Sequence, residues 1–343
     1  MSIVLVTGAT GQVGSRVVRK LLRRGYRVQA FVMPNDPFSG RLAGLDLEVV
    51  EGNLLDAAAV EQSVGRADAV IHTANFVGCP PGMDESAFFD NNVRSTLHLA
   101  LAAGRQAERI QRFVHISSSA VYPNDSHVLA PCYHPVDEEH PKRFTGVYAM
   151  SKWIGEDIVE ATRRETGLRT VIIRPSGIVS GEAILSRYTV GFVINVLRSA
   201  QRHPRSEIHY PHIAETLKEL EQANPQQPID ARDADGRTWL YQPADARDVA
   251  EACILALEEP NAVGEAFNVA APRPIPFAEA APLISEATGL PVLTKEFPVR
   301  FIYDLSITKA KTLLGYQPRW DIAPMVRSAT AVRQGEASGY EEE

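Results

Sequence analysis

The sequence of 343 residues predicts an α/β protein built on a doubly wound, parallel β-sheet. Short apolar runs rich in β-branched residues alternate with amphipathic stretches throughout the first half of the chain. A glycine-rich turn separates the first apolar run from the first amphipathic stretch. We expect strands at 3–6, 28–32, 47–50, 69–72, 112–117 and 170–174, and helices at about 12–24, 57–64, 90–107 and 146–166.

The glycine-rich turn is Thr7-Gly8-Ala9-Thr10-Gly11-Gln12-Val13-Gly14, which follows the apolar run Ile3-Val4-Leu5-Val6. A strand, a tight turn and a helix N-terminus bring backbone N–H groups and the helix dipole to one place, where they can bind a pyrophosphate. In this arrangement Gly8 makes the turn, Gly11 lets the phosphates approach, and Gly14 lets the helix pack on the strand. A second strand follows in the right order, so the turn predicts a dinucleotide-binding site.

The end of the second strand bears on which dinucleotide is bound. An acidic residue there would bind a ribose 2′-hydroxyl, whereas an arginine would favour a 2′-phosphate. The sequence has Val32-Met33-Pro34-Asn35-Asp36, with no Lys or Arg before Arg41. This pattern mildly favours NAD over NADP and leaves both open.

Candidate catalytic residues lie farther along the chain. Ser118 follows the strand Phe113-Val114-His115-Ile116, at the carboxyl edge of the predicted sheet. Tyr148 and Lys152 are four residues apart in a helical stretch, which places them on one helix face. A free tyrosine has a pKa of about 10, and a neighbouring ammonium would lower it and so allow proton transfer near neutral pH. A serine hydroxyl close by could bind and orient the substrate oxygen.

The chain resembles the extended short-chain dehydrogenase/reductase superfamily, and within it the NAD-dependent epimerase/dehydratase family. The resemblance covers most of the chain and is carried by several motifs in the expected order. The motifs are Thr7-Gly8-xx-Gly11-xx-Gly14, Val70-Ile71-His72-Thr73-Ala74, Asn92-Val93-Arg94-Ser95-Thr96, Ser118 before Val121-Tyr122, Tyr148-xxx-Lys152, Arg174-Pro175-Ser176-Gly177, Arg247-Asp248-Val249-Ala250, Ala266-Phe267-Asn268-Val269 and Leu314-Gly315-Tyr316-Gln317-Pro318.

The resemblance implies a Rossmann-type fold and a set of site residues. The implied catalytic residues are Ser118, Tyr148 and Lys152. The implied cofactor-binding residues are Gly8, Thr10, Gly11, Gln12, Val13, Gly14, Met33, Asn53, Leu54, Thr73, Ala74, Asn92, Tyr148, Lys152, Pro175, Gly177 and Ile178. The candidate substrate-binding residues are Phe76, Ser118, Ser119, Arg187 and Tyr188.

Departures from the family pattern narrow the reaction. Family 4,6-dehydratases carry Asp-Glu after the catalytic threonine, where this chain has Ser119-Ala120, so a dehydratase is disfavoured. Many nucleotide-sugar enzymes have Asn at the position of Gly177, so its absence weakens the case for a nucleotide sugar. The leading interpretation is an epimerase-type oxidoreductase that acts on a secondary alcohol or ketone of a sugar. The alternatives are a dehydrogenase or ketoreductase with exchangeable cofactor and, third, a non-catalytic dinucleotide-binding protein.

The alternation of strands and helices breaks up after Gly177. We expect a helix over 184–201 and then a polar, proline-containing stretch over about 203–238, with a short helix at 212–223, which is a candidate lid over the substrate. The helix at 245–258 and the strand at 266–269 return to the cofactor domain. We therefore assign 1–176 and about 239–271 to a dinucleotide-binding domain, and about 177–238 and 272–334 to a smaller, mostly helical substrate subdomain with helices at 276–288 and 306–314. The segment 335–343 is expected to be a flexible acidic tail.

The overall composition limits the possible partners. A net charge of -7 gives no basic surface for nucleic acid, and no apolar run is long enough to span a bilayer. Three scattered cysteines and a first strand that begins at once predict a cytoplasmic protein without a signal peptide. His203, His209 and His212 have no cysteine or carboxylate pair at ligand spacing, so no metal is expected. The resemblance implies a homodimer formed through the helices at about 90–107 and 146–166, acting on a small-molecule substrate.

Overall fold

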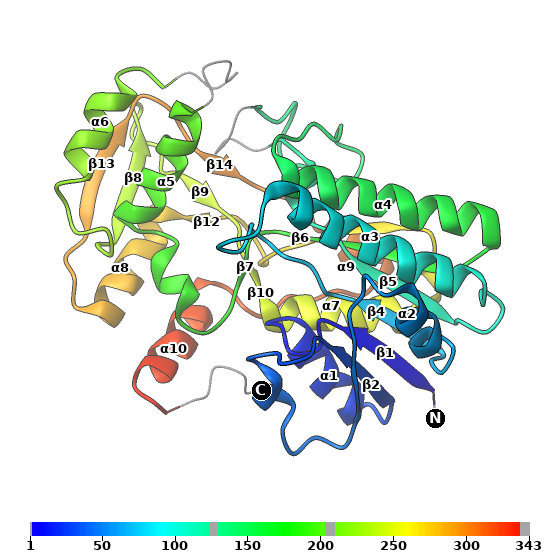
Figure 1. Ribbon diagram of the computed structural model, residues 1–343. Coiled ribbons are helices and arrows are strands. Elements are labelled where there is room, and N and C mark those ends of the chain that lie inside the picture. Colours follow the sequence, from blue (N-terminus) through cyan, green and yellow to red (C-terminus); the bar gives the residue numbers. More distant parts are fainter. Residues whose placement is uncertain (1, 124–128, 203–209, 337–343) are drawn as a thin grey trace.

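A seven-stranded parallel sheet forms the centre of the first part of the chain (Figure 1). The computed structural model describes residues 2–123, 129–202 and 210–336. The strand order is β3-β2-β1-β4-β5-β6-β11, with every neighbouring pair parallel. The strands are β1 (Ile3–Thr7), β2 (Arg27–Val32), β3 (Glu48–Glu51), β4 (Ala69–His72), β5 (Arg112–Ile116), β6 (Thr170–Pro175) and β11 (Ala266–Val269). The prediction of a doubly wound parallel sheet is confirmed.

Helices cover both faces of this sheet, as the apolar patterns predict. On one face α1 (Gly14–Arg23) packs against α7 (Ala246–Glu258), and their buried residues share a core with β1, β2 and β6. On the other face α2 (Ala57–Val64), α3 (Glu85–Gly104) and α4 (Val147–Thr166) pack side by side (Figure 1). The buried side chains of these three helices form a second core.

The rest of the chain forms a smaller region with its own hydrophobic core, centred on Trp239, Phe277 and Phe301. Its helices are α5 (Val190–Gln201), α6 (Ile213–Leu220), α8 (Phe277–Thr288) and α10 (Ile322–Arg333), and α9 (Thr308–Leu313) packs instead against β11. Its strands are β8 (Ile229–Asp233) with β13 (Leu293–Phe297), and β9 (Leu240–Tyr241) with β12 (Ile275–Pro276) and β14 (Ile302–Tyr303). The pair β7 (Ile178–Val179) and β10 (Ala244–Asp245) lies where the two regions join. These short strands were not expected in a mostly helical region.

Two expectations about the second half need correction. The single helix expected over 184–201 is divided into a 3₁₀ helix, η3 (Gly181–Ser186), and α5. The division falls at Thr189, whose side chain accepts a hydrogen bond from the backbone N–H of Phe192 and so caps a new helix. The stretch over 203–238 is only in part polar and exposed, because β8 within it is largely buried and pairs with β13. Residues 203–209 and 337–343 of the expected lid and tail lie outside the described residues.

The carboxyl ends of the central strands lie together and define the edge at which ligands of such sheets bind. The strand register pairs Thr7 with His72, His72 with His115, and Ile116 with Ile173. The loops after β1, β4, β5 and β6 therefore leave the sheet side by side. In the part of the chain that the structure describes, no helix combines the length and the apolar character that a bilayer crossing requires.

Candidate active site

The glycine loop between β1 and α1 is closely packed at all three of its glycines. Gly8 has φ of +65°, and a Cβ atom there would lie 2.7 Å from the backbone nitrogen of Ala74. A Cβ atom on Gly14 would overlap the carbonyl oxygen of Gly8. At Gly11 the nearest described atom is the same carbonyl oxygen, 3.1 Å from such a Cβ. Gly8 and Gly14 are therefore required by the fold, and a side chain at Gly11 would also press on the carbonyl oxygen of Gly8.

The N-terminus of α1 has the features of an anion-binding site. Val13, which is buried, is the N-cap residue, and no described side chain caps the helix. The first turn of α1 has no acidic residue, and the N–H groups of Ser15 and Arg16 donate to the backbone carbonyl oxygens of Gly11 and Val13, each at 3.0 Å. Gln12 is exposed beside them. The dipole of α1, with no capping side chain among the described residues at its start, fits the pyrophosphate of a dinucleotide.

An acidic and a basic side chain reach the glycine loop from the segment after β2. Thr10 donates a hydrogen bond from Oγ1 to Oδ2 of Asp36 at 2.6 Å. Arg41 donates from Nη1 to the carbonyl oxygen of Thr10 at 2.8 Å, and its guanidinium lies 4.3 Å from the centre of the Phe38 ring. Met33, between β2 and Asp36, is about half exposed. Arg41 therefore contacts the glycine loop although it lies nine residues beyond the end of β2 in the sequence. The absence of a basic residue before Arg41 is thus no argument for NAD over NADP.

The loop after β4 lies against the glycine loop. Thr73 donates from Oγ1 to the carbonyl oxygen of Thr7 at 2.8 Å, and Ala74 lies next to Gly8. Asn92 on α3 is buried, and its side chain both accepts from the N–H of Phe76 at 2.9 Å and donates to the carbonyl oxygen of Phe76 at 3.0 Å. Asn92 therefore holds the backbone of this loop, and both ends of its amide are used in doing so.

Asn53 and Leu54, two of the candidate cofactor-binding residues, follow β3. The amide oxygen of Asn53 accepts a hydrogen bond from the N–H of Leu55 at 2.9 Å. The carbonyl oxygen of Leu54 is bonded to Nδ1 of His98 on α3 at 2.9 Å. Both contacts fix the turn between β3 and α2, and the side chain of Asn53 is exposed.

Tyr148 and Lys152 lie one turn apart on α4, close to the end of β5. The ammonium of Lys152 lies 6.0 Å from the centre of the Tyr148 ring and donates to the carbonyl oxygen of Ile116 at 2.8 Å. Burial lowers the pKa of Lys152 to about 7, against the opposing charge of Glu156. Burial also raises the pKa of Tyr148, and a hydrogen bond with Ser118 offsets part of that effect. The net shift of the Tyr148 pKa is therefore upward, opposite to the lowering expected from the sequence, because loss of hydration outweighs the hydrogen bond with Ser118.

Two neighbouring serines at the end of β5 have different partners. The hydroxyl of Ser118 accepts from the N–H of Ala120 at 3.1 Å and caps the 3₁₀ helix η2 (Ser119–Val121), and it also bonds to Tyr148. The hydroxyl of Ser119 is hydrogen-bonded to that of Tyr303, which comes from β14 in the smaller region. Ser118 is therefore the serine next to the candidate acid/base. Ser119, a candidate substrate residue, is already paired within the protein.

The side chain of Tyr241 packs against the loop that follows β6. Pro175 ends β6, and Ile178, partly buried, begins β7. A Cβ atom on Gly177, between them, would collide with the hydroxyl of Tyr241, a residue of β9. The rings of Tyr241 and Tyr303 lie 5.6 Å apart, so together they form an aromatic wall on this side of the site.

The structure separates the two remaining candidate substrate residues. Tyr188 is fully buried, packs against Phe277, and donates to the carbonyl oxygen of Tyr241 at 3.1 Å, so the structure places it in the core. Arg187 is partly exposed and lines a separate cavity of about 490 Å³ beside α5. A smaller cavity of about 160 Å³ adjoins Tyr148 itself. That cavity is lined by Ala120, Tyr122, Pro123, Leu129, Arg143, Phe144, Thr145, Tyr148 and Ala149.

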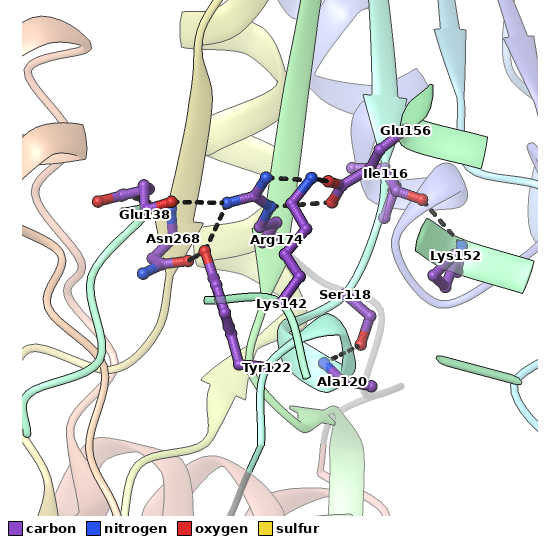
Figure 2. A network of polar contacts seen from close by, with 10 residues as sticks. All are labelled: Ile116, Ser118, Ala120, Tyr122, Glu138, Lys142, Lys152, Glu156, Arg174 and Asn268. Atoms are coloured by element: carbon purple, nitrogen blue, oxygen red, sulfur yellow. Dashed lines mark hydrogen bonds and ion pairs between the residues drawn. The ribbon is translucent and has the colours of Figure 1, made fainter. Parts of the chain in front are cut away.

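Four residues at the site were not among the candidates from sequence: Asp36, Glu156, Tyr241 and Tyr303. Glu156 had a local signal, because it follows Lys152 at the same spacing of four that separates Lys152 from Tyr148. Figure 2 shows its carboxylate bound by both Arg174 and Lys142. The two tyrosines had no such signal, because they come from short strands far along the chain.

The sequence disfavours a metal site formed by His203, His209 and His212. His203 and His209 lie outside the described residues, and His212 precedes α6 with φ of +53°. Within the described ranges no three His, Cys, Asp or Glu side chains gather closely enough to hold a metal ion.

Comparison with known proteins agrees with this architecture. The family model described as the NAD dependent epimerase/dehydratase family matches residues 4–270. A crystal structure of a short-chain dehydrogenase/reductase superfamily protein from Agrobacterium tumefaciens, with bound NAD, is similar over 97% of each chain, with 30% identity and a TM-score of 0.78.

Two curated relatives have different activities. The 3 beta-hydroxysteroid dehydrogenase/Delta 5-->4-isomerase of Mycobacterium tuberculosis is 35% identical over 187 residues, which are 51% of this chain and 46% of that protein. The UDP-glucose 4-epimerase of Rhizobium meliloti is 32% identical over 178 residues, which are half of each chain. The chain thus spans about half the length of the curated relatives it matches. On the fold, the glycine loop and the match to the family model, the protein belongs to the NAD-dependent epimerase/dehydratase family of the short-chain dehydrogenase/reductase superfamily.

Proposed function

We propose that this protein interconverts a secondary alcohol and its ketone with a nicotinamide dinucleotide. The observation that carries the proposal is the meeting of Ser118, Tyr148 and Lys152 at the carboxyl edge of the sheet, the edge at which the glycine loop also leaves β1. This edge is where open α/β sheets bind dinucleotides, and the phenol and the ammonium are the groups that proton transfer requires.

Each residue has a distinct role in this proposal. Tyr148 removes the proton from the alcohol in oxidation and returns it to the alkoxide in reduction. Ser118, already bonded to Tyr148, orients the substrate oxygen toward the phenol. Lys152 holds the ribose of the dinucleotide and stabilises the phenolate form of Tyr148. When bound, the dinucleotide supplies the hydride acceptor or donor. The backbone at the start of α1 would hold its pyrophosphate, and Pro175, Gly177 and Ile178 would lie beside the nicotinamide.

Within this chemistry we place a dehydrogenase or ketoreductase first. The position at which many nucleotide-sugar enzymes carry Asn is Gly177 here, and the hydroxyl of Tyr241 fills the adjacent space. This packing argues against a nucleotide sugar and reverses the order of the two interpretations from sequence. The epimerase cycle remains the second candidate, because the relative from Rhizobium meliloti is a UDP-glucose 4-epimerase. A sugar or another small secondary alcohol would be a suitable substrate for either reaction, the dehydrogenase or the epimerase.

We propose NAD as the dinucleotide, with Asp36 as the acidic residue that binds the ribose 2′-hydroxyl. The similar protein from Agrobacterium tumefaciens has NAD bound. The carboxylate of Asp36 is held at the glycine loop by Thr10, where a 2′-phosphate would meet its negative charge. Arg41, on the same loop residue, is the group that would favour NADP.

The proposal extends to the division of the chain and its assembly. The sheet and the helices on its two faces would bind the dinucleotide, and the smaller region around Trp239 would bind the substrate. A homodimer through α3 and α4, which lie side by side on one face, is expected. Light scattering at micromolar concentration distinguishes a dimer from a monomer.

The first experiment is to denature freshly purified protein and identify any released nucleotide by chromatography. An empty protein that binds added NADH and oxidises or reduces a secondary alcohol or ketone in multiple turnovers supports the dehydrogenase. NAD released in near-stoichiometric amount supports the epimerase cycle, which keeps its cofactor. A protein that neither contains nor binds NAD or NADP would refute the function in both forms.

A further inference from the structure

We propose that the cavity of about 490 Å³ beside α5 is a second ligand-binding site, in which Arg187 binds the anionic group of a small polar molecule. The anionic group is a carboxylate or a phosphate. A cavity of this size lies within the range of about 300–1,000 Å³ that is usual for small-molecule sites. It shares no lining residue with the cavity at Tyr148, so its ligand does not depend on the proposed function.

The first observation is that the walls of this cavity are already joined to each other. The cavity lies between α5 and the segment that follows α6, two helices that pack together in the smaller region (Figure 1). The N–H of Val190 donates to the carbonyl oxygen of Gln227, and the N–H of Gly191 donates to that of Pro225, each at 2.9 Å. These backbone bonds fix the two sides, so a ligand would enter a site that needs little further ordering.

The second observation is that Arg187, between η3 and α5, lines the cavity with an unpaired guanidinium. Its Nε is shielded from solvent and has no hydrogen-bond partner, and no described residue forms an ion pair with it. Arginine stays charged at every pH at which the protein is folded and carries five N–H donors in one plane. A buried donor without an acceptor costs free energy, so such a group normally has one. The acceptors that match a guanidinium best are carboxylate and phosphate oxygens.

The third observation is that the other charged groups of the cavity balance each other. Arg198 on α5 lies 2.7 Å from the carboxylate of Glu221, and the described residues that line the cavity include no second acid. The lining therefore has an excess of one positive charge, which is that of Arg187. Asn195 and Gln226, both exposed, also line the cavity, and their side-chain amides can donate to the oxygens of the same ligand.

The fourth observation concerns the apolar side of the cavity, which is formed by Phe192. The ring of Phe192 lines the cavity and packs 5.2 Å from the ring of Tyr241. Tyr241 belongs to the aromatic wall of the candidate active site. An aromatic ring near a cation and two amides suits a short carbon skeleton that carries hydroxyl groups and one anionic group.

The test is a calorimetric titration of the full chain, without dinucleotide, at one ionic strength. The probes are inorganic phosphate, glucose 6-phosphate and gluconate, with uncharged glucose as the control for the sugar part. At least one of the three anions should bind saturably and more tightly than glucose, and the tighter of the phosphate and carboxylate probes identifies the anionic group. Arg187→Met should weaken this binding by about 10–100-fold, because the ligand loses a charged hydrogen-bond donor. Arg187→Lys, which keeps the charge but not the planar fork, should restore part of the affinity.

The matched control is Arg202→Met, the same substitution at the C-terminal end of α5, at a residue that does not line the cavity. Its affinity for the anions should equal that of the wild type. Glu221→Gln should act in the opposite direction and tighten anion binding by about 3–10-fold, because it removes the acid of the lining and frees Arg198. A role of Arg187 in folding alone would not produce this gain.

Three results would overturn the proposal. They are a wild type that binds none of the anions saturably, glucose that binds as tightly as the anions, and a folded Arg187→Met with wild-type affinity, whose anion would then lie elsewhere, as at the glycine loop. If Arg187→Met does not fold, a Glu221→Gln protein that binds anions no more tightly than the wild type would overturn it. Inactivity on every alcohol and ketone would overturn the proposed function alone, because this titration needs no turnover.

Discussion

The ammonium of Lys152 donates a hydrogen bond to the backbone carbonyl of Ile116 across 2.8 Å, which joins α4 to the end of β5. Ile116 immediately precedes the serines of the site, so this one contact sets the distance between the lysine and the strand end. Because burial lowers the pKa of this ammonium to about 7, its protonation changes near neutral pH.

The first prediction follows from this pKa. Ketone reduction needs Tyr148 protonated, which its raised pKa ensures, and it needs the ammonium of Lys152, which is lost as pH rises through about 7. We expect kcat/KM for the reduced cofactor to fall above pH 7, because this ratio reports the groups of the free enzyme. In Lys152→Arg, whose guanidinium stays charged, the rate should be lower but the decline should move to higher pH. If kcat/KM of Lys152→Arg falls over the same pH range as in the wild type, a group other than Lys152 causes the fall.

A second prediction concerns the acid/base. Tyr148→Phe should lower kcat/KM by about 10²–10⁴-fold, because general acid–base groups contribute that much, while the Kd for NADH stays nearly unchanged. The matched control is Tyr133→Phe, at an exposed tyrosine bonded to Asp137, which should keep its activity. Retention of more than a tenth of wild-type turnover in Tyr148→Phe would contradict the role of the phenol.

A third prediction concerns the choice of dinucleotide. Asp36→Asn should weaken NADH binding by about 10–100-fold, since a hydrogen bond to a charged group contributes about 1.5–3 kcal/mol. The same substitution should reduce the difference in affinity between NADH and NADPH. Arg41→Ala should act in the opposite direction, by weakening NADPH more than NADH. Fluorescence titration of both reduced dinucleotides measures the two effects, and equal losses for the two in Asp36→Asn would remove Asp36 from the choice.

A fourth prediction tests whether close packing at Gly14 requires a glycine there. Gly14→Ala should abolish or strongly weaken dinucleotide binding and lower the Tm, because its Cβ overlaps the carbonyl oxygen of Gly8. Gly40→Ala is the matched control, since its Cβ would meet open space and its φ lies outside the left-handed region. Thermal unfolding with and without NADH compares them. A Gly14→Ala protein with wild-type Tm and affinity would show that the loop relaxes.

The fifth prediction concerns the substrate side. Tyr241→Phe removes the hydroxyl that lies against Gly177 and should change KM for the substrate more than Kd for NADH. Gly177→Ala in the wild type should lower activity, because the added methyl group meets that hydroxyl. In the Tyr241→Phe background the same glycine substitution should cost less, and the double-mutant cycle measures this coupling. If the losses of activity in Gly177→Ala and Tyr241→Phe are additive, the two residues act independently.

The elements of the fold that follow from local pattern were predicted well. Continuous apolar runs identify β1, β4 and β5, because these strands are covered by helices on both faces of the sheet. The period of 3.6 residues identifies α1 and α4, each of which buries one side. The spacing between Tyr148 and Lys152 belongs to the same class, as does the unrecognised spacing to Glu156. The helix expected over 184–201 was wrong at Thr189, where a capping hydroxyl competes with helix continuation.

By itself the sequence determined the parallel sheet, the glycine turn and the helix stripe that carries the phenol and the ammonium, since each depends on residues within a few positions of one another. Only the tertiary structure decided which groups surround them. Tyr303 reaches Ser119 across 184 positions of sequence, and Arg41 reaches Thr10 across 31. Such contacts depend on how separate elements pack, for which no local period exists. The electrostatic state of Lys152 and Tyr148 was decided there too, because it depends on how much water the packed chain excludes.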